Sequence, residues 1–390
     1  MQRSLVARII DCIFLSIGIA VVGLIVMFFS ALLGGLTFYT LLTAAITIGS
    51  ITLVIVYMFT SINRRLLSRV IIGFIGLGAL SVAGREGFQA YEASITMMSD
   101  QDVDLREYKP FAEHTKAKRL EPSSKLALRD DLPRLDGATA LYPLYSAFVQ
   151  AVYPEKNYDL YESEVMANTT PQAYENLING TVDIIFAAGP SEEQREMAKN
   201  KGVELTLTPI GKEAFVFFVN AANPVTGLTT KQIQDIYTGS VTDWSEVGGK
   251  PGAIQAFQRP ENSGSQTMLL KVMGNKQLMA APREDIASGM GGIISQTADY
   301  KNYKNAIGYS FLYFATEMVQ NGNIRLLEVD GVKPDKQTIR DGTYPLTAEF
   351  YAVTAGSSNP HVGRFIEWIR SSQGQTLVEQ TGYTPMIDSH

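Results

Sequence analysis

The sequence predicts an α/β domain of two lobes, preceded by about three transmembrane helices. Residues 9–84 are almost free of charged side chains, whereas the rest of the chain has the composition of a soluble protein. From Leu135 onward, apolar strand-like runs alternate with amphipathic helical segments, which is the pattern of layered α/β domains. That alternation continues for about 255 residues, which favours two lobes over a single sheet.

The apolar block is long enough for several membrane-spanning helices, since a span needs ~20 apolar residues. Helices are expected at about 9–34, 36–62 and 66–84. The third run reaches spanning length only if Leu66, Leu67 and a snorkelling Arg69 are included. A cleaved signal peptide is the alternative, but its apolar region has only ~7–15 residues. The length of the block therefore favours retained helices.

Positive charge around these helices predicts their orientation. Arg3 and Arg8 precede the first helix, and Arg64, Arg65 and Arg69 lie between the second and the third. Because positive residues stay on the cytoplasmic side, the N-terminus is expected in the cytoplasm. Three crossings of the cell membrane then place the remaining chain outside.

Residues 99–130 are predicted to form a linker, either laid against the domain or partly mobile, because charge, proline and serine are frequent there. The folded domain itself is expected over 131–390. Its apolar or alternating runs predict strands, in a mainly parallel sheet, at 158–165, 182–189, 204–211, 213–220, 253–259, 306–314 and 347–353. Helices are predicted up to about Tyr153 and at 171–180, 229–239, 265–274 and 361–380, the last as one helix or two.

Three of the expected helices begin with hydroxyl-bearing residues in a similar arrangement. The residues are Thr139 with Ala140, Thr169 with Thr170, and Ser263 with Gly264 and Ser265. Free backbone N–H groups and the helix dipole make such helix starts suitable for binding an anion. Plain N-capping, which serine and threonine perform in most proteins, is the alternative at each position.

Arg259 strengthens the anion-binding interpretation. It ends a predicted strand four residues before Ser263, and Glu261 follows it two positions on. A guanidinium group can hold an oxyanion through two parallel hydrogen bonds, and Glu261 is placed to orient it. A surface Arg–Glu pair without a ligand remains the alternative.

Six segments resemble the phosphate-binding proteins of bacterial phosphate ABC transporters, which have the type II periplasmic-binding-protein fold. They are, in the same order, 136–144, 168–190, 233–249, 259–267, 306–314 and 344–353. The resemblance covers residues 131–390. It implies one lobe from 131–215 and 346–390 and a second lobe from 216–345, which close on an anion.

The resemblance also implies the ligand-binding residues. They are Thr139, Ala140, Thr169, Thr170, Arg259, Ser263, Gly264 and Ser265, with Glu261 bracing Arg259. The family has an aspartate that accepts a hydrogen bond from protonated phosphate, but this chain has Ala188 at that position. Because sulfate has no proton to donate, such a carboxylate excludes sulfate, and its loss relaxes the expected selectivity. Asp136 or Asp183 is a possible substitute, and the glycine-rich segment 287–297 is a possible further wall.

Composition excludes several other functions. The net charge of −6 argues against a nucleic-acid partner. The three histidines, His114, His361 and His390, form no metal or triad pattern, so neither an enzyme nor a cofactor is expected. The predicted function is therefore a membrane-tethered solute-binding protein that delivers phosphate or a similar oxyanion to an ABC permease. A membrane-anchored anion sensor or interaction module without transport, and a domain that binds no anion, are the alternatives.

Overall fold

The computed structural model describes residues 5–32, 38–60, 62–94, 97–98, 103–280, 300–301, 304–318 and 323–386. Two compact units, Met1–Ser94 and Ile95–His390, make up the chain and are described separately. Arg3, the segment 287–297 and His390 lie outside the described residues.

The first unit contains three helices, α1 (Leu5–Leu32), α2 (Phe38–Phe59) and α3 (Arg64–Ser94). Each includes a stretch of 22 to 25 residues that is long and apolar enough to cross a membrane. Glycines allow close packing between them, because a side chain at Gly23 would meet Thr47, and one at Gly49 would meet Phe74. The third helix is longer than predicted, so its apolar stretch reaches spanning length.

The second unit is a mixed α/β domain. Its α-helices are α4 (Tyr142–Val152), α5 (Thr170–Ile178), α6 (Glu192–Asn200), α7 (Thr230–Tyr237), α8 (Gly264–Met273), α9 (Lys336–Arg340), α10 (Val362–Arg370) and α11 (Ser372–Thr381). Short helical turns are η2 (Leu105–Tyr108), η3 (Thr139–Leu141), η4 (Trp244–Val247) and the π-helical η6 (Phe314–Met318). The main sheet contains β2 (Leu135–Gly137), β3 (Ile184–Ala188), β4 (Thr206–Asn220), β6 (Gln255–Ala256), β8 (Ala306–Phe311), β9 (Ile324–Leu326) and β11 (Thr347–Thr354). Two small sheets pair β1 (Met97–Met98) with β7 (Tyr300–Lys301), and β5 (Gly227–Leu228) with β10 (Glu328–Val329).

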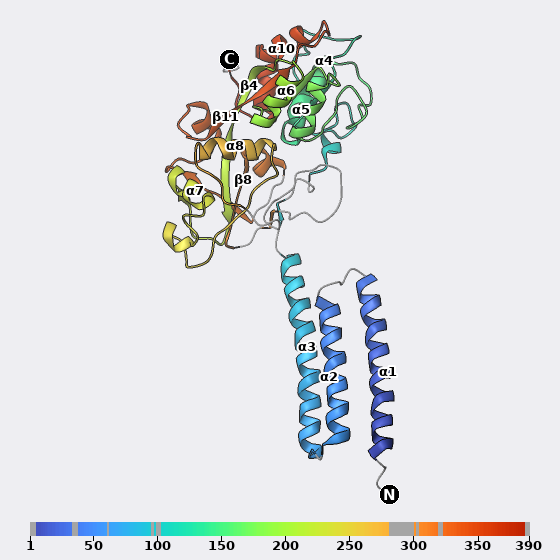
Figure 1. The fold of residues 1–390 in the computed structure, drawn as a ribbon. Helices are drawn as coiled ribbons and strands as arrows, with labels where there is room; N and C mark the ends of the chain where they lie inside the picture. The colour runs from blue at the N-terminus through green and yellow to red at the C-terminus, as the bar shows by residue number, and fades with distance from the viewer. Residues whose placement is uncertain are drawn as a thin grey trace. The chain divides into compact units, whose positions relative to one another are not determined.

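One long strand, β4, connects the two ends of this sheet. The strand order is β2-β3-β11-β4-β8-β6, and β9 also pairs with β4. Residues 206–214 of β4 pair with β11, and residues 215–219 pair with β8. Figure 1 shows α4, α5, α6 and α10 around one end of β4, and α7 and α8 around the other.

The prediction of a mainly parallel sheet is wrong. Among the described strands of the main sheet, only β2–β3 and β6–β8 are parallel, whereas β11 and β4 run antiparallel to their neighbours. The segments 204–211 and 213–220, expected as two strands, belong to the single strand β4. Two parallel neighbouring strands need a crossover connection between them, usually a helix, and none is present here. The segment 158–165 is irregular, with one bridge from Val165 to Leu135.

Much of the predicted linker packs against the domain. Leu105 and Tyr108 are buried in the main core, as is Leu128. The Leu128 N–H donates to the Val152 carbonyl at 2.8 Å, and Lys125 N–H donates to Gln373 Oε1 at 2.9 Å. These contacts attach residues 105–128 to α4 and to the start of α11.

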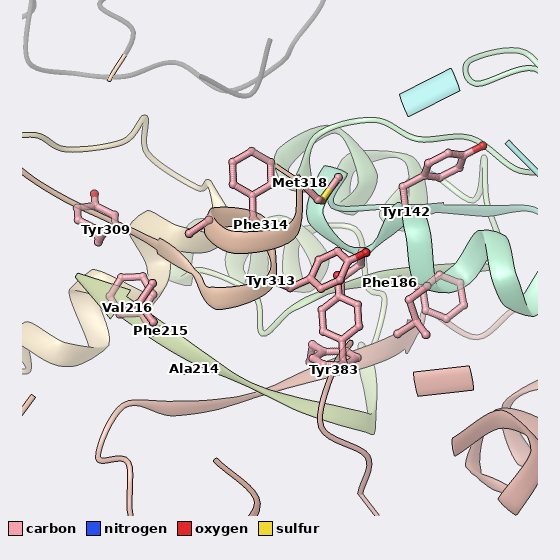
Figure 2. Packing of buried hydrophobic residues seen from close by; sticks show 14 of the residues in the cluster. Tyr142, Phe186, Ala214, Phe215, Val216, Tyr309, Tyr313, Phe314, Met318 and Tyr383 are labelled. Carbon is pink, nitrogen blue, oxygen red and sulfur yellow. The ribbon is translucent and has the colours of Figure 1, made fainter. Parts of the chain in front are cut away.

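A continuous aromatic core holds the second unit together. Phe215 lies 5.4 Å from Tyr309 between ring centroids, and Tyr145 stacks on Phe186 at 5.0 Å. Figure 2 shows Tyr313 and Tyr383 next to each other in this core, where their rings stack at 4.5 Å. Burying such rings is a large favourable term in folding, and it fixes the strand ends that surround the site.

Candidate functional site

A cavity of about 270 Å³ lies among the ends of several strands and helices of the second unit. All eight residues predicted to bind an anion line it: Thr139, Ala140, Thr169, Thr170, Arg259, Ser263, Gly264 and Ser265. They come from three separate stretches of the chain. The structure therefore brings together what the sequence showed only as separate motifs, and their role as ligands remains a prediction.

The first wall is the turn that follows β2. This strand pairs in parallel with β3, and the Ala138 N–H donates to the Phe186 carbonyl at 2.8 Å. Gly137 is required for this approach, because a Cβ there would lie 2.6 Å from the same carbonyl oxygen. Thr139 and Ala140 then enter η3, where the first N–H groups of a helical turn have no partners inside it.

Asp136 fixes this turn to the second wall. It is fully buried, and its Oδ1 accepts hydrogen bonds from the N–H groups of Gly137 (2.8 Å) and Asn168 (2.9 Å). Its Oδ2 accepts from the side-chain amides of Asn168 (2.9 Å) and Asn176 (2.8 Å). Burial raises the pKa of Asp136 above its ordinary value, and these hydrogen bonds offset only part of that rise. Asp136 therefore positions the loops but does not line the cavity.

The second wall is the start of α5. Thr169 is the N-cap residue, yet its side chain makes no capping hydrogen bond, and Pro171 occupies the first turn. Proline there loses nothing, because the N–H it lacks has no partner inside the helix. N-capping therefore does not explain Thr169.

The third wall is the loop from Arg259 to the start of α8. Arg259 N–H donates to Gln266 Oε1 and to the Tyr309 hydroxyl, both at 2.9 Å, which fixes the backbone three residues after the end of β6. Ser263 is an N-cap in the ordinary sense, because its Oγ accepts from Gln266 N–H at 3.2 Å. Glu261 is exposed and does not line the cavity, so its expected bracing of Arg259 stays a prediction.

The starts of α5 and α8 meet at this cavity. A Cβ placed on Gly264 would lie 3.4 Å from Thr170 Oγ1 and 3.6 Å from the Ala188 Cβ. Two positive helix ends and their hydroxyl groups thus lie beside one another, and Arg259 is on the same wall. Helix ends and a guanidinium group together favour negative charge at this point.

Sequence reasoning missed two carboxyl groups on the cavity wall, Glu213 and Glu349. Glu213 lies in β4 and is only 6% exposed, whereas Glu349 lies in β11 and is half-buried. Burial raises the pKa of Glu213 to about 8, although the hydrogen bond from the Tyr313 N–H lowers it. The sequence feature that could have indicated Glu213 is its position as a single carboxyl residue directly before the apolar run from Ala214 to Val219.

The cavity also has an apolar side and lacks the two substitutes considered for the missing aspartate. Phe311, Phe314 and Phe350 line it, together with Ala188. Asp183 lies off the cavity wall, where its carboxylate binds Arg134 and the Ser357 hydroxyl. Within the described ranges, no group of three or more His, Cys, Asp or Glu side chains is placed to hold a metal ion.

Comparisons with known proteins identify the family of the second unit. A family model described as a PBP superfamily domain matches residues 129–373. The phosphate-binding protein PstS of Bacillus subtilis is 26% identical over 259 residues, which cover 65% of this chain and 80% of that protein. PstS of Borreliella burgdorferi is 26% identical over 216 residues, which cover 53% of this chain and 75% of that protein.

A solved structure confirms the predicted periplasmic-binding-protein-like α/β fold. It is a putative phosphate ABC transporter substrate-binding protein with bound phosphate from Clostridium perfringens. Its TM-score is 0.50 at 21% identity, and the match covers 65% of this chain and 98% of that one.

Proposed function

The chain belongs to the PBP superfamily, and we propose that it is a membrane-tethered, extracytoplasmic binding protein for phosphate or a similar oxyanion. One observation carries the proposal: a single cavity is lined by Arg259, several hydroxyl groups and the starts of two helices. These groups donate hydrogen bonds and supply positive potential without a bound metal. They suit reversible capture of an oxyanion rather than its chemical conversion.

Binding by the full chain in detergent micelles tests this proposal. Isothermal titration calorimetry with inorganic phosphate and with sulfate is expected to detect binding of at least phosphate. Arg259→Ala removes the guanidinium group, and charged hydrogen bonds of about 2–3 kcal/mol correspond to a loss of roughly 30- to 150-fold in affinity. Arg259→Lys is the matched control, because it keeps the positive charge but cannot form two parallel hydrogen bonds. Its affinity is expected to lie between those of wild type and Arg259→Ala.

Two results would contradict the proposal. Wild-type protein that gives no heat with either anion would exclude an oxyanion-binding function. Unchanged affinity in Arg259→Ala would remove Arg259 from the site, provided that tryptophan fluorescence shows the variant to be folded.

The membrane arrangement rests on the three apolar helices and on the positive charge near the start of α1 (Arg3 and Arg8) and at the start of α3 (Arg64, Arg65 and Arg69). It is tested by placing a cysteine at the exposed Lys201 in a Cys12→Ser background, since Cys12 is the chain's single cysteine. A membrane-impermeant maleimide is expected to label Lys201→Cys in intact spheroplasts. Labelling only after the cells are broken would place the second unit in the cytoplasm.

Delivery of the anion to an ABC permease is supported by the likeness to the Clostridium perfringens structure, which is described as a putative phosphate ABC transporter substrate-binding protein. A second candidate is an anion sensor without transport, which is favoured by the presence of three apolar helices where a simple tether needs one. Purification of the full chain from native membranes distinguishes them. Co-purification with an ABC permease supports delivery, whereas a membrane partner without a permease domain supports the sensor.

A further inference from the structure

Glu213 is a buried carboxyl group on the wall of the anion cavity. It lies in β4 opposite Ala348 of β11, and its Oε1 accepts a hydrogen bond from the Tyr313 N–H at 2.6 Å. Within the part of the chain that the structure describes, its Oε2 makes no hydrogen bond. The ring of Tyr313 stacks on Tyr383 (Figure 2), which in turn packs edge-on against Phe350. Glu213 Oε1 thus already has a hydrogen-bond donor from the protein, whereas Oε2 can interact with a molecule bound in the cavity.

No basic side chain among the described residues forms an ion pair with Glu213. The charged and titratable groups around it are Lys212 on its own strand, Glu349 on β11, Arg259 on the wall of the same cavity, Tyr313 with nearby Tyr108 and Glu317, and Tyr383. Burial raises the pKa of Tyr313 and of Tyr383, so both phenols are uncharged at neutral pH. Burial without a paired positive charge favours the protonated carboxyl, which raises the pKa of Glu213 to about 8.

Building on the proposed function, we propose that Glu213 shares one proton with the bound oxyanion and thereby determines which anion the cavity accepts. A carboxylate oxygen and an anion oxygen repel each other in a site that excludes water, unless a proton lies between them. That proton comes either from the protein or from the ligand. The same pair of oxygens can therefore form a hydrogen bond in two opposite directions.

The consequence is a selectivity that changes with pH. When Glu213 is protonated, it donates to phosphate and sulfate alike. When Glu213 is ionised, it accepts a hydrogen bond from hydrogen phosphate, but it repels sulfate, which carries no proton. Sulfate then binds only if the protein takes up a proton, whereas hydrogen phosphate brings its own.

Calorimetry of the full chain in detergent, with inorganic phosphate and with sulfate from pH 6 to 9.5, tests this inference. Sulfate affinity is expected to fall about tenfold per pH unit above pH 8, and phosphate affinity much less. Glu213→Gln cannot ionise but keeps a hydrogen-bond donor, so its sulfate affinity is expected to be the same at pH 6 and at pH 9.5. Glu349→Gln, which removes the other carboxyl on this wall, is expected to retain the wild-type dependence on pH.

A second measurement needs no variant. At pH 9, in buffers of different ionisation enthalpy, the heat of sulfate binding by wild type is expected to report uptake of close to one proton. Sulfate binding without proton uptake and with constant affinity would overturn the inference while leaving oxyanion binding intact. A pH dependence lost in Glu349→Gln but kept in Glu213→Gln would also overturn it. No binding of either anion by wild type would overturn the proposed function itself, and the inference with it.

Discussion

Replacing Glu213 with glutamine should change how the stability of the unbound protein depends on pH. Burial raises the pKa of Glu213 from the ordinary 4.5 to about 8. Between these values the folded chain holds a proton that the unfolded chain has released, so stability falls as pH rises. The slope is about 1.4 kcal/mol per pH unit for one proton. The slope is smaller near both pKa values, so from pH 5 to pH 8 the wild type is expected to lose about 3.5 kcal/mol more than Glu213→Gln.

Urea unfolding followed by tryptophan fluorescence measures this difference in the full chain. Both tryptophans, Trp244 and Trp368, are buried in the second unit, so the signal follows that unit alone. The buffers must contain neither phosphate nor sulfate, since a bound anion would add its own stabilisation. Ser310→Ala is the matched control, because it alters the same cavity wall without a titratable group.

Other ionisable groups contribute equally to the pH dependence of unfolding in wild type and in Glu213→Gln, so their contributions cancel when the two proteins are compared. If the two proteins lose stability in parallel from pH 5 to pH 8, Glu213 is ionised in the folded protein across that range. The reasoning about its burial would then be refuted.

Two further predictions concern the loops that carry Thr139 and Thr169. Asp136→Ala leaves the buried N–H groups of Gly137 and Asn168 without their acceptor and is expected to lower the free energy of unfolding by roughly 3 kcal/mol; it should also weaken phosphate binding in calorimetry, and a stable variant with normal affinity would contradict the positioning role. Gly137→Ala forces a Cβ to within 2.6 Å of a β3 carbonyl oxygen and is expected to cost about 1–3 kcal/mol in urea unfolding, whereas an unaffected midpoint would show that the strand moves freely.

Local patterns were enough to predict most of the secondary structure. The apolar run 182–189 contains β3. The segment 361–380, expected as one helix or two, forms the two helices α10 and α11, which Ser371 separates. The same local patterns gave the wrong strand directions. The direction of a strand relative to its neighbours depends on which strands pair. β11 pairs with β4, which lies about 140 positions earlier in the chain, so no local pattern reveals this pairing.

The candidate site, too, was predictable from the sequence only in part. Hydroxyl residues before helix starts and an arginine at a strand end are recognisable one motif at a time, and all eight predicted residues lie on one cavity. Capping could not be separated from ligand binding by sequence, because both use the same residue types. Only the structure distinguishes Ser263, which caps its helix, from Thr169, which does not.

The sequence by itself determined that apolar helices precede an α/β domain, and which residues are chemically able to hold an anion. Those properties follow from composition and from periodicity over a few residues. The tertiary structure alone decided that Glu213 joins that wall, whereas Asp136 and Asp183 do not. A strand that is nearly all apolar gives no sign of where its single carboxyl group lies. Its surroundings, and therefore its charge, are set by β11, Tyr313 and Tyr383, which lie at least 100 residues away in the chain.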